Sequence, residues 1–229
     1  MKRIVASLIL MLAGCAVVHA GTITGTVRAR GKEGDGDAGG GKYDSRKFKF
    51  VERVEFAELK DFVVHVVGPP GTNAAPPEKP AQVVTRKVSQ KGAAFTPHVL
   101  PIVVGTTVEW PNNDDIFHNV FSISESKEFD LGLYKHPETK SVTFDKPGRV
   151  DVFCSIHKSM NCVVLVLENP WFAAADAQGR YSITNVPPGK YKLKAWHERL
   201  PSRAQEIVVP ADGEVRVDFT LGLADAPKP

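Results

Sequence analysis

Three side chains that can bind a soft metal ion lie close together in residues 154–160, which read Cys-Ser-Ile-His-Lys-Ser-Met. The spacing C-x2-H-x2-M places Cys154, His157 and Met160 on one short loop between two β-type runs. Such a loop can turn a thiolate, an imidazole and a thioether toward one point, and copper prefers this set of donors. A structural zinc site draws its four ligands from cysteine, histidine and carboxylate, and methionine is not a usual zinc donor. The loop therefore predicts a copper site.

A fourth ligand is expected from the upstream segment 112–121, Asn-Asn-Asp-Asp-Ile-Phe-His-Asn-Val-Phe, where His118 begins a strand-like run. Two histidines, one cysteine and a weak methionine are the donors of a blue-copper centre holding a single Cu(I)/Cu(II) ion. Met160 by itself would more often fill a hydrophobic core, so the prediction depends on all four donors together. Four other histidines are scattered through strands and turns without the H-x-H spacing of a second copper centre, and we expect structural roles for them: His65, His98, His136 and His197.

Short β-strands must position these ligands. Residues 83–167 consist of short runs of β-branched and aromatic residues separated by glycine, proline and asparagine, without a helical period of useful length. The expected strands are VVTRKVSQ, PIVVGTTVEW, HNVFSIS, KSVTF, RVDVF and CVVLVLE. Similar runs are expected near residues 21–29, 47–51, 62–67, 180–186, 191–197, 205–209 and 214–221. The pattern predicts an all-β protein built from sandwiches or Greek-key barrels.

The segment from Val83 to Leu167 resembles the cupredoxins, through WPNNDDIFHNVFS, FCSIHKSM and the stretch between Phe95 and Trp110. Its short C-x2-H-x2-M loop is closest to that of amicyanin. The resemblance implies a Greek-key β-sandwich with a plastocyanin-like or amicyanin-like type 1 copper ion.

By the same resemblance, His118 and His157 would be equatorial nitrogen ligands, Cys154 the thiolate and Met160 a long axial ligand. Asn119 would hold the ligand loops together and offer its backbone N–H to the cysteine sulfur, a contact of the kind that tunes a metal site.

The last part of the chain resembles a carboxypeptidase regulatory-like module, a transthyretin-type β-sandwich, through ADAQGRYSITNVPPGKYKLKAWH. Two strands that come first in such a module, GTITGTV and FVVHVVG, here precede the copper segment. We therefore expect the cupredoxin domain, residues 79–167, to be inserted between a first part at 21–78 and a second part at 168–222, with a tail at 223–229. In the alternative linear arrangement, residues 60–67 belong to the cupredoxin. A regulatory-like sandwich is a scaffold and by itself assigns no activity.

Residues 1–20 have a positive start, an apolar stretch and a Val-His-Ala ending, which predict a secretory signal peptide cleaved after Ala20. The apolar stretch is short for a bilayer span. A lipobox-like Leu-Ala-Gly-Cys ending at Cys15 offers lipoprotein anchoring as the alternative, and the protein would be associated with a membrane only in that case. Either alternative predicts an exported, periplasmic protein. Residues 31–42 are rich in glycine and charge and are expected to form a flexible loop.

The charge balance argues against nucleic acid as a partner. The chain has 29 basic and 26 acidic side chains, and loss of Lys2 and Arg3 with the leader would leave 27 against 26. Cleavage would also leave only Cys154 and Cys162, with one disulfide between them as the alternative to a copper thiolate. Cys162 is expected to be a small buried hydrophobic residue.

The ligand set and the resemblance predict a one-electron carrier that is not an enzyme and has no small-molecule substrate. Its partners would be other redox proteins, with the edge of His157 as the electron's exit. Around it, Pro97, Val99, Ile116 and Phe117 could form an apolar rim. Two alternatives stay open: a copper-handling protein, and an adhesion-type module with a vestigial site.

Overall fold

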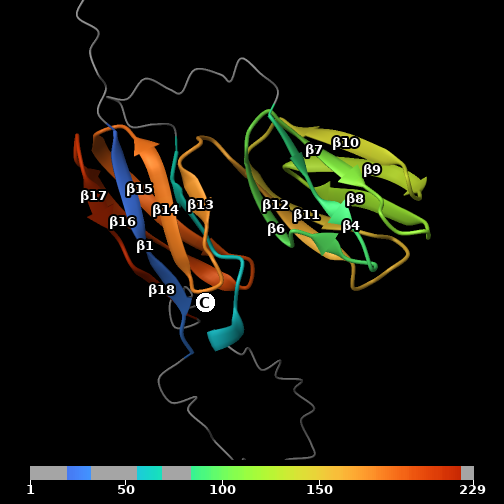
Figure 1. Cartoon of the computed structure of the whole chain (residues 1–229), viewed down its shortest axis with the longest axis horizontal. Coiled ribbons are helices and arrows are strands. Elements are labelled where there is room, and N and C mark those ends of the chain that lie inside the picture. Colours follow the sequence, from blue (N-terminus) through green and yellow to red (C-terminus); the bar gives the residue numbers. More distant parts are fainter. Residues whose placement is uncertain (1–19, 32–55, 69–83, 223–229) are drawn as a thin grey trace, which may run out of the picture.

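The computed structural model describes residues 20–31, 56–68 and 84–222, which form two β-sandwiches (Figure 1). Apart from the 3-10 helix η1 (Phe56–Glu58), the regular structure of this part is all β. The predicted all-β fold is therefore confirmed. Two sequence predictions lie outside the described residues except at their ends: the leader at 1–20 and the glycine-rich loop at 31–42. The strand expected at 47–51 lies wholly outside them.

The central sandwich contains the predicted ligands. Its larger sheet has the order β6-β12-β11-β8-β9, opposed by a sheet with the order β10-β7-β3 and a small β4-β5 ribbon. These strands are β3 (Thr85–Lys87), β4 (Ser89–Gln90), β5 (Phe95–Thr96), β6 (Val99–Val103), β7 (Thr106–Pro111), β8 (His118–Ser124), β9 (Lys127–Tyr134), β10 (Thr139–Phe144), β11 (Gly148–Phe153) and β12 (Asn161–Leu167).

Alternating side chains of the two sheets fill the core of the central sandwich. Val108 and Trp110 of β7 alternate with half-buried residues, as expected for a strand with one face on a core. They pack with Phe144, Val120 and Val152 from neighbouring strands, all of them fully excluded from solvent. Cys154 and Met160 belong to the same cluster, so two side chains of the predicted copper loop pack in the hydrophobic core.

The flanking sandwich is built from strands on both sides of the central one. Its sheets have the orders β14-β1-β17, with β18 also pairing with β1, and β13-β2-β15-β16. These strands are β1 (Gly21–Ala29), β2 (Val63–Val66), β13 (Phe172–Ala174), β14 (Arg180–Val186), β15 (Gly189–His197), β16 (Leu200–Val209), β17 (Glu214–Arg216) and β18 (Phe219–Leu221). Ile23, Val64, Ile183 and Leu193 lie in its core.

The chain leaves the flanking sandwich after β2 and returns to it as β13. These two strands pair antiparallel, with Phe172 opposite His65, although the whole central sandwich separates them in sequence. The buried side chain of Asn169 ties the crossing together, because its amide donates to the carbonyl oxygens of Val66 and Gly68 while its oxygen accepts from the N–H of Trp171. Since β2 pairs with β13 and β15, residues 63–66 belong to the flanking sandwich. This topology is the one that an inserted domain produces, and the exact boundaries stay a prediction.

The two sandwiches lie side by side, with β6 and β12 of one next to β13 of the other (Figure 1). A third apolar cluster fills the contact between them. The central sandwich contributes Val99, Val163, Leu165 and Leu167, and the flanking sandwich contributes Val63, Trp196 and the partly buried Phe172. Val99 is only 5% exposed here, so its predicted place on an apolar rim around the copper site is wrong.

Two strands of the central sandwich were not expected from the sequence, the two-residue β5 and the longer β9. Strand β9 is an edge strand whose side chains alternate between exposed charges and half-buried apolar residues. Its pairing with β8 is interrupted by a bulge between Asn119 and Phe121, and Gly132 adopts a positive φ of 65°. Such edge irregularities weaken the local signal of a strand.

Candidate metal centre

The loop 154–160 is a tight connection between β11 and β12. The strands pair up to Phe153 and Asn161, and the N–H of Cys154 then donates to the carbonyl oxygen of Met160 over 3.1 Å. Inside the loop, the N–H of Met160 donates to the carbonyl oxygen of His157 over 2.9 Å. These two bonds fix the backbone at both ends of the C-x2-H-x2-M segment.

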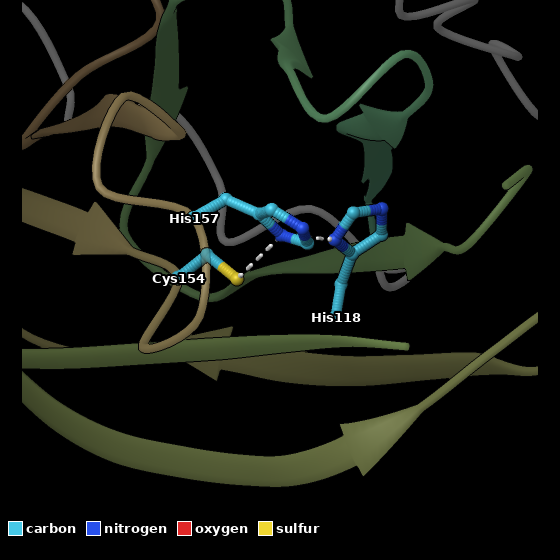
Figure 2. Close-up of side chains that lie close together, drawn as sticks. All are labelled: His118, Cys154 and His157. Atoms are coloured by element: carbon cyan, nitrogen blue, oxygen red, sulfur yellow. Dashed lines mark hydrogen bonds between the residues drawn. The ribbon is translucent and has the colours of Figure 1, made fainter. Parts of the chain in front are cut away.

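His118 is the first residue of β8 and is 0% exposed. Its pairing with Tyr134 in β9 places the ring beside the loop 154–160. The Nδ1 atoms of His118 and His157 are 3.1 Å apart, and Nδ1 of His157 lies 3.7 Å from Sγ of Cys154 (Figure 2). The three residues form the group of metal-ligating side chains found in the described part of the chain, with their ligand atoms all within 4.8 Å of one another.

The spacings of 3.1 and 3.7 Å fit donors that share one metal ion. Metal–nitrogen bonds of about 2.0 Å and metal–thiolate bonds of about 2.3 Å, as in protein zinc sites, place two donors in one coordination sphere roughly 3–4 Å apart. Two imidazoles and a thiolate are also the equatorial donors of a blue-copper centre. The residues present therefore fit copper in both geometry and donor type.

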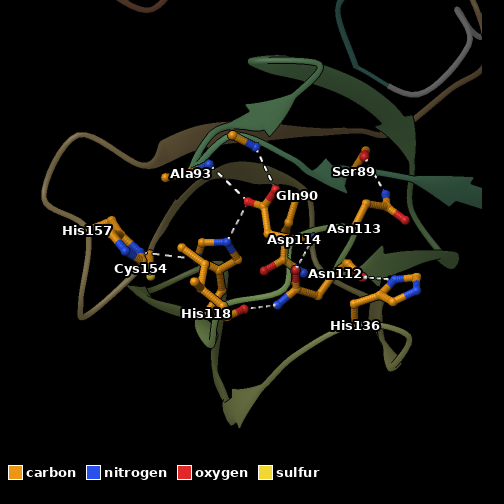
Figure 3. Close-up of polar contacts among 12 residues, drawn as sticks. Ser89, Gln90, Ala93, Asn112, Asn113, Asp114, His118, His136, Cys154 and His157 are labelled. Carbon is orange, nitrogen blue, oxygen red and sulfur yellow. Dashed lines mark hydrogen bonds and ion pairs between the residues drawn. The ribbon is translucent and has the colours of Figure 1, made fainter.

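Asp114 orients His118 from the side opposite the predicted metal. Its Oδ2 lies 2.8 Å from Nε2 of His118, so the ring donates its Nε2–H to the carboxylate and keeps the lone pair of Nδ1 facing His157 (Figure 3). Such carboxylate–histidine pairs fix the tautomer and raise the basicity of a metal ligand. Asp114 was not predicted from the sequence. The available signal was an acidic residue four positions before His118, but the sequence alone cannot distinguish it from the neighbouring Asp115.

The carboxylate of Asp114 is itself held by the turn between β4 and β5. The backbone N–H groups of Gly92 and Ala93 donate to it over 2.8 and 3.0 Å, and both residues have positive φ angles. Successive N–H groups in such a turn form an anion-binding concavity. Partial burial on its own would raise the pKa of Asp114, but the hydrogen bonds from Ala93, Gly92 and His118 outweigh it and lower the pKa to about 2.

Asn112 shapes the loop that leads into His118. Its buried side chain donates to the carbonyl oxygens of Ile116 and Tyr134, and its oxygen accepts from the N–H of Asp114. The neighbouring Asn113 donates to Oγ of Ser89, and Nδ1 of His136 lies 3.3 Å from the carbonyl oxygen of Asn112 (Figure 3). The segment that leads into His118 and the backbone of Asp114 are therefore positioned by one hydrogen-bond network.

The two other predicted site residues lie on the same elements. Met160 is 1% exposed and closes the ligand loop, and its role as an axial ligand stays a prediction. Asn119 follows His118 in β8, where its Oδ1 is 3.4 Å from the N–H of Ser155 and its amide donates to Asp130. Its side chain thus connects β8 to the ligand loop, and the donation from its backbone N–H to sulfur stays a prediction.

Cys154 and Cys162 are both free and buried. Cys162 lies in β12 opposite Val152, and burial raises the pKa of its thiol well above the ordinary range. A thiol held in its neutral form behaves as a small apolar side chain. Among the other histidines, His197 contacts Phe62 with the ring centroids 4.8 Å apart and the rings tilted by 39°, and His98 pairs with Glu198.

Comparison with known proteins identifies two kinds of domain. Residues 82–167 match the family described as copper binding proteins, plastocyanin/azurin family. Residues 162–222 match the carboxypeptidase regulatory-like domain. No curated protein sequence matches the chain.

Several solved structures resemble part of the chain. A copper-containing nitrite reductase from Thermus scotoductus SA-01 is 34% identical over 44% of this chain and 25% of its own, with a TM-score of 0.35. A purple cupredoxin from Nitrosopumilus maritimus is 28% identical over 35% of this chain and 97% of its own, with a TM-score of 0.32. An amicyanin mutant in the Cu(I) state is 24% identical over 37% of this chain and 81% of its own, with a TM-score of 0.33. The chain therefore spans a quarter of the nitrite reductase and most of the two small proteins.

The family matches confirm the two resemblances seen in the sequence. The chain contains a copper-binding domain of the plastocyanin/azurin type and a carboxypeptidase regulatory-like β-sandwich.

Proposed function

We propose that this protein, which combines a cupredoxin domain with a regulatory-like sandwich, is a type 1 copper protein that carries single electrons between redox partners and is not an enzyme. The proposal depends on one observation: His118, Cys154 and His157 bring two nitrogens and a sulfur within 4.8 Å of one another at the edge of a packed β-sandwich. Copper held there by these residues and by Met160 would supply a single Cu(II)/Cu(I) couple.

The residues of the site favour electron transfer because they are held in place from several sides. His118 is oriented by Asp114, and the loop of Cys154 and Met160 is closed by its own backbone hydrogen bonds. A site fixed in this way needs little rearrangement when the electron arrives or leaves. His118, Cys154 and Met160 are 0%, 6% and 1% exposed, which disfavours the rapid ligand exchange that a copper-handling protein needs.

His157 is the partly exposed member of the set and offers the route to a partner. Exposed apolar residues adjoin both histidines in sequence: Ile116 and Phe117 precede His118, and Ile156 precedes His157, each 49% exposed. Contiguous exposed apolar side chains often form protein interaction sites. We therefore propose that a redox protein docks there, with Ile156 taking the place on the rim that the sequence analysis gave to Val99.

We also propose that the protein acts in the periplasm, on the evidence of the signal-like residues 1–20. Lipid attachment at Cys15 is the alternative, and both features lie outside the described residues. Within the described residues, no helix is both long and apolar enough to cross a bilayer.

The test is voltammetry of the copper-loaded protein, combined with transfer of Cu(I) to a chelator. An electron carrier gives a reversible one-electron wave and releases Cu(I) slowly. Rapid transfer of Cu(I) without a reversible wave would support copper handling instead. Absence of copper binding would leave a β-sandwich module with a vestigial site.

A further inference from the structure

The contact between the two sandwiches ends at the metal-binding loop. Its apolar part includes Val163 of β12, and the residue after the ligand loop, Asn161, begins the same strand. A polar cluster of His98, Glu198 and Arg149 lies beside this apolar part. None of these three residues takes part in the proposed copper site itself.

His98 connects this cluster to the ligand loop. It lies between β5 and β6, and its Nδ1 is 3.3 Å from the carbonyl oxygen of Asn161, the residue directly after Met160. The carbonyl oxygen of His98 also accepts the N–H of Val163 over 2.8 Å. Asn161 itself donates from its side chain to the carbonyl oxygen of Ser159 inside the ligand loop. The Met160 end of the loop is therefore held by His98 on one side and by β11 on the other.

Glu198 fixes the ring of His98 from the flanking sandwich. It lies in the turn between β15 and β16, and its Oε1 is 2.9 Å from Nε2 of His98. The two side chains are 35% and 22% exposed, so this pair is partly shielded from solvent. Arg149 of β11 donates to the backbone carbonyl oxygen of Glu198 over 3.1 Å and lies over the ring of Trp196, which holds the turn against the central sandwich.

We propose that Glu198 is a positioning residue for the metal centre: through His98 and Asn161, the flanking sandwich braces the Met160 end of the ligand loop. This role rests on the proposed copper site. It gives the regulatory-like sandwich a part in setting the geometry of the loop, beyond that of a passive scaffold. If the proposed site holds copper with Met160 as a weak ligand, small shifts at this end of the loop would alter the spectrum and the reduction potential of the copper.

The test compares four single variants of the full chain and the double variant Glu198→Ala/His98→Ala. Glu198→Ala and His98→Ala each remove one partner of the brace. Glu198→Gln removes the charge but keeps an oxygen that can accept the hydrogen bond. Glu206→Ala is the matched control, because it removes an exposed carboxylate from β16 of the same hairpin.

The first readout is amide hydrogen exchange of Cys154 and Met160 in the metal-free protein, since both N–H groups form the hydrogen bonds of the ligand loop. Loss of one net hydrogen bond should speed their exchange about threefold to tenfold in Glu198→Ala and in His98→Ala. The double variant should add little to either single change, because both act on one interaction. Glu198→Gln should retain most of the protection, and Glu206→Ala all of it.

The second readout is the absorption and EPR spectrum of the copper-loaded variants. Glu198→Ala and His98→Ala should change the ratio of the charge-transfer bands and the copper hyperfine splitting, and Glu206→Ala should not. Equal behaviour of Glu198→Ala and Glu206→Ala in both readouts would overturn the proposal. Equal effects of Glu198→Gln and Glu198→Ala would also overturn it, because they would show that the charge of Glu198 acts and its hydrogen bond to His98 does not. If the wild-type protein binds no copper, the proposed function fails, while the exchange rates still decide whether the brace exists.

Discussion

Asp114 offers a sharp test of how the candidate site is organised. Its carboxylate accepts hydrogen bonds from His118, Gly92 and Ala93, and these lower its pKa from 3.8 to about 2. A shift of this size corresponds to about 2.5 kcal/mol of preference for the charged form in the folded state, and screening by solvent reduces the usable part to about 1–2 kcal/mol. The sign follows from the lowered pKa: this stabilisation is present above the unfolded pKa near 4 and is lost as the pH falls toward 2.

We expect Asp114→Asn to destabilise the metal-free protein by about 1–2 kcal/mol at pH 7, because the neutral amide loses the charge that these donors stabilise. It should also weaken copper binding about tenfold to a hundredfold, because His118 loses the carboxylate that orients it. Urea unfolding measures the first effect, with hydrogen exchange of the β8 amides assigning the transition to the central sandwich. Competition with a copper chelator measures the second.

The matched control is Asp115→Asn, which removes the same charge from the exposed neighbouring position. It should change neither stability nor copper affinity by more than a few tenths of a kcal/mol. The reasoning is refuted if Asp114→Asn behaves like Asp115→Asn in both assays.

Three further predictions concern other parts of the molecule. Burial lowers the pKa of His65 from 6.5 to about 4, so the stabilisation from its neutral ring should be complete above pH 6.5 and fall by about 2 kcal/mol by pH 5. In urea unfolding, His65→Gln should reduce this dependence of the free energy of unfolding on pH. An unchanged pH dependence would contradict the prediction. A Cβ at Gly25 would clash with the carbonyl oxygen of Val217, so Gly25→Ala should lower the free energy of unfolding by about 3 kcal/mol. A stability equal to wild type would show that β1 and Val217 are not so close. Met160→Leu preserves the buried volume but removes the thioether. Voltammetry should show a higher reduction potential, and the free energy of unfolding should fall by less than about 1.5 kcal/mol. An unchanged potential would argue against axial ligation.

The elements of the fold could be predicted where one face of a strand is buried. The alternation in GTITGTV predicted a strand near residues 21–29, and β1 spans Gly21–Ala29 with its alternate residues buried. Strand β9 escaped notice because its alternation combines charges with a glycine at the sheet edge. Val99 shows a different limit: its run predicts a strand, but nothing local indicates that a second sandwich covers its outward face.

In the candidate site, too, some residues can be recognised from the local sequence and others only from the folded structure. Cys154, His157 and Met160 are visible from spacing because they share one loop, and His118 is visible because it begins a strand after a turn-rich segment. Asp114, Gly92 and Ala93 are not visible, because their contacts depend on how two distant turns meet in space. The same holds for His98 and Glu198, which come together only through the packing of the two sandwiches.

The most direct test of the central claim is the visible and EPR spectrum of residues 21–229 loaded with Cu(II), recorded beside Cys154→Ser. A type 1 centre formed by His118, Cys154 and His157 predicts an intense visible thiolate-to-copper band and a narrow copper hyperfine splitting, both absent from the variant. A colourless wild-type protein, or a spectrum that the substitution leaves unchanged, would contradict the assignment of Cys154 as the ligand of a blue-copper site.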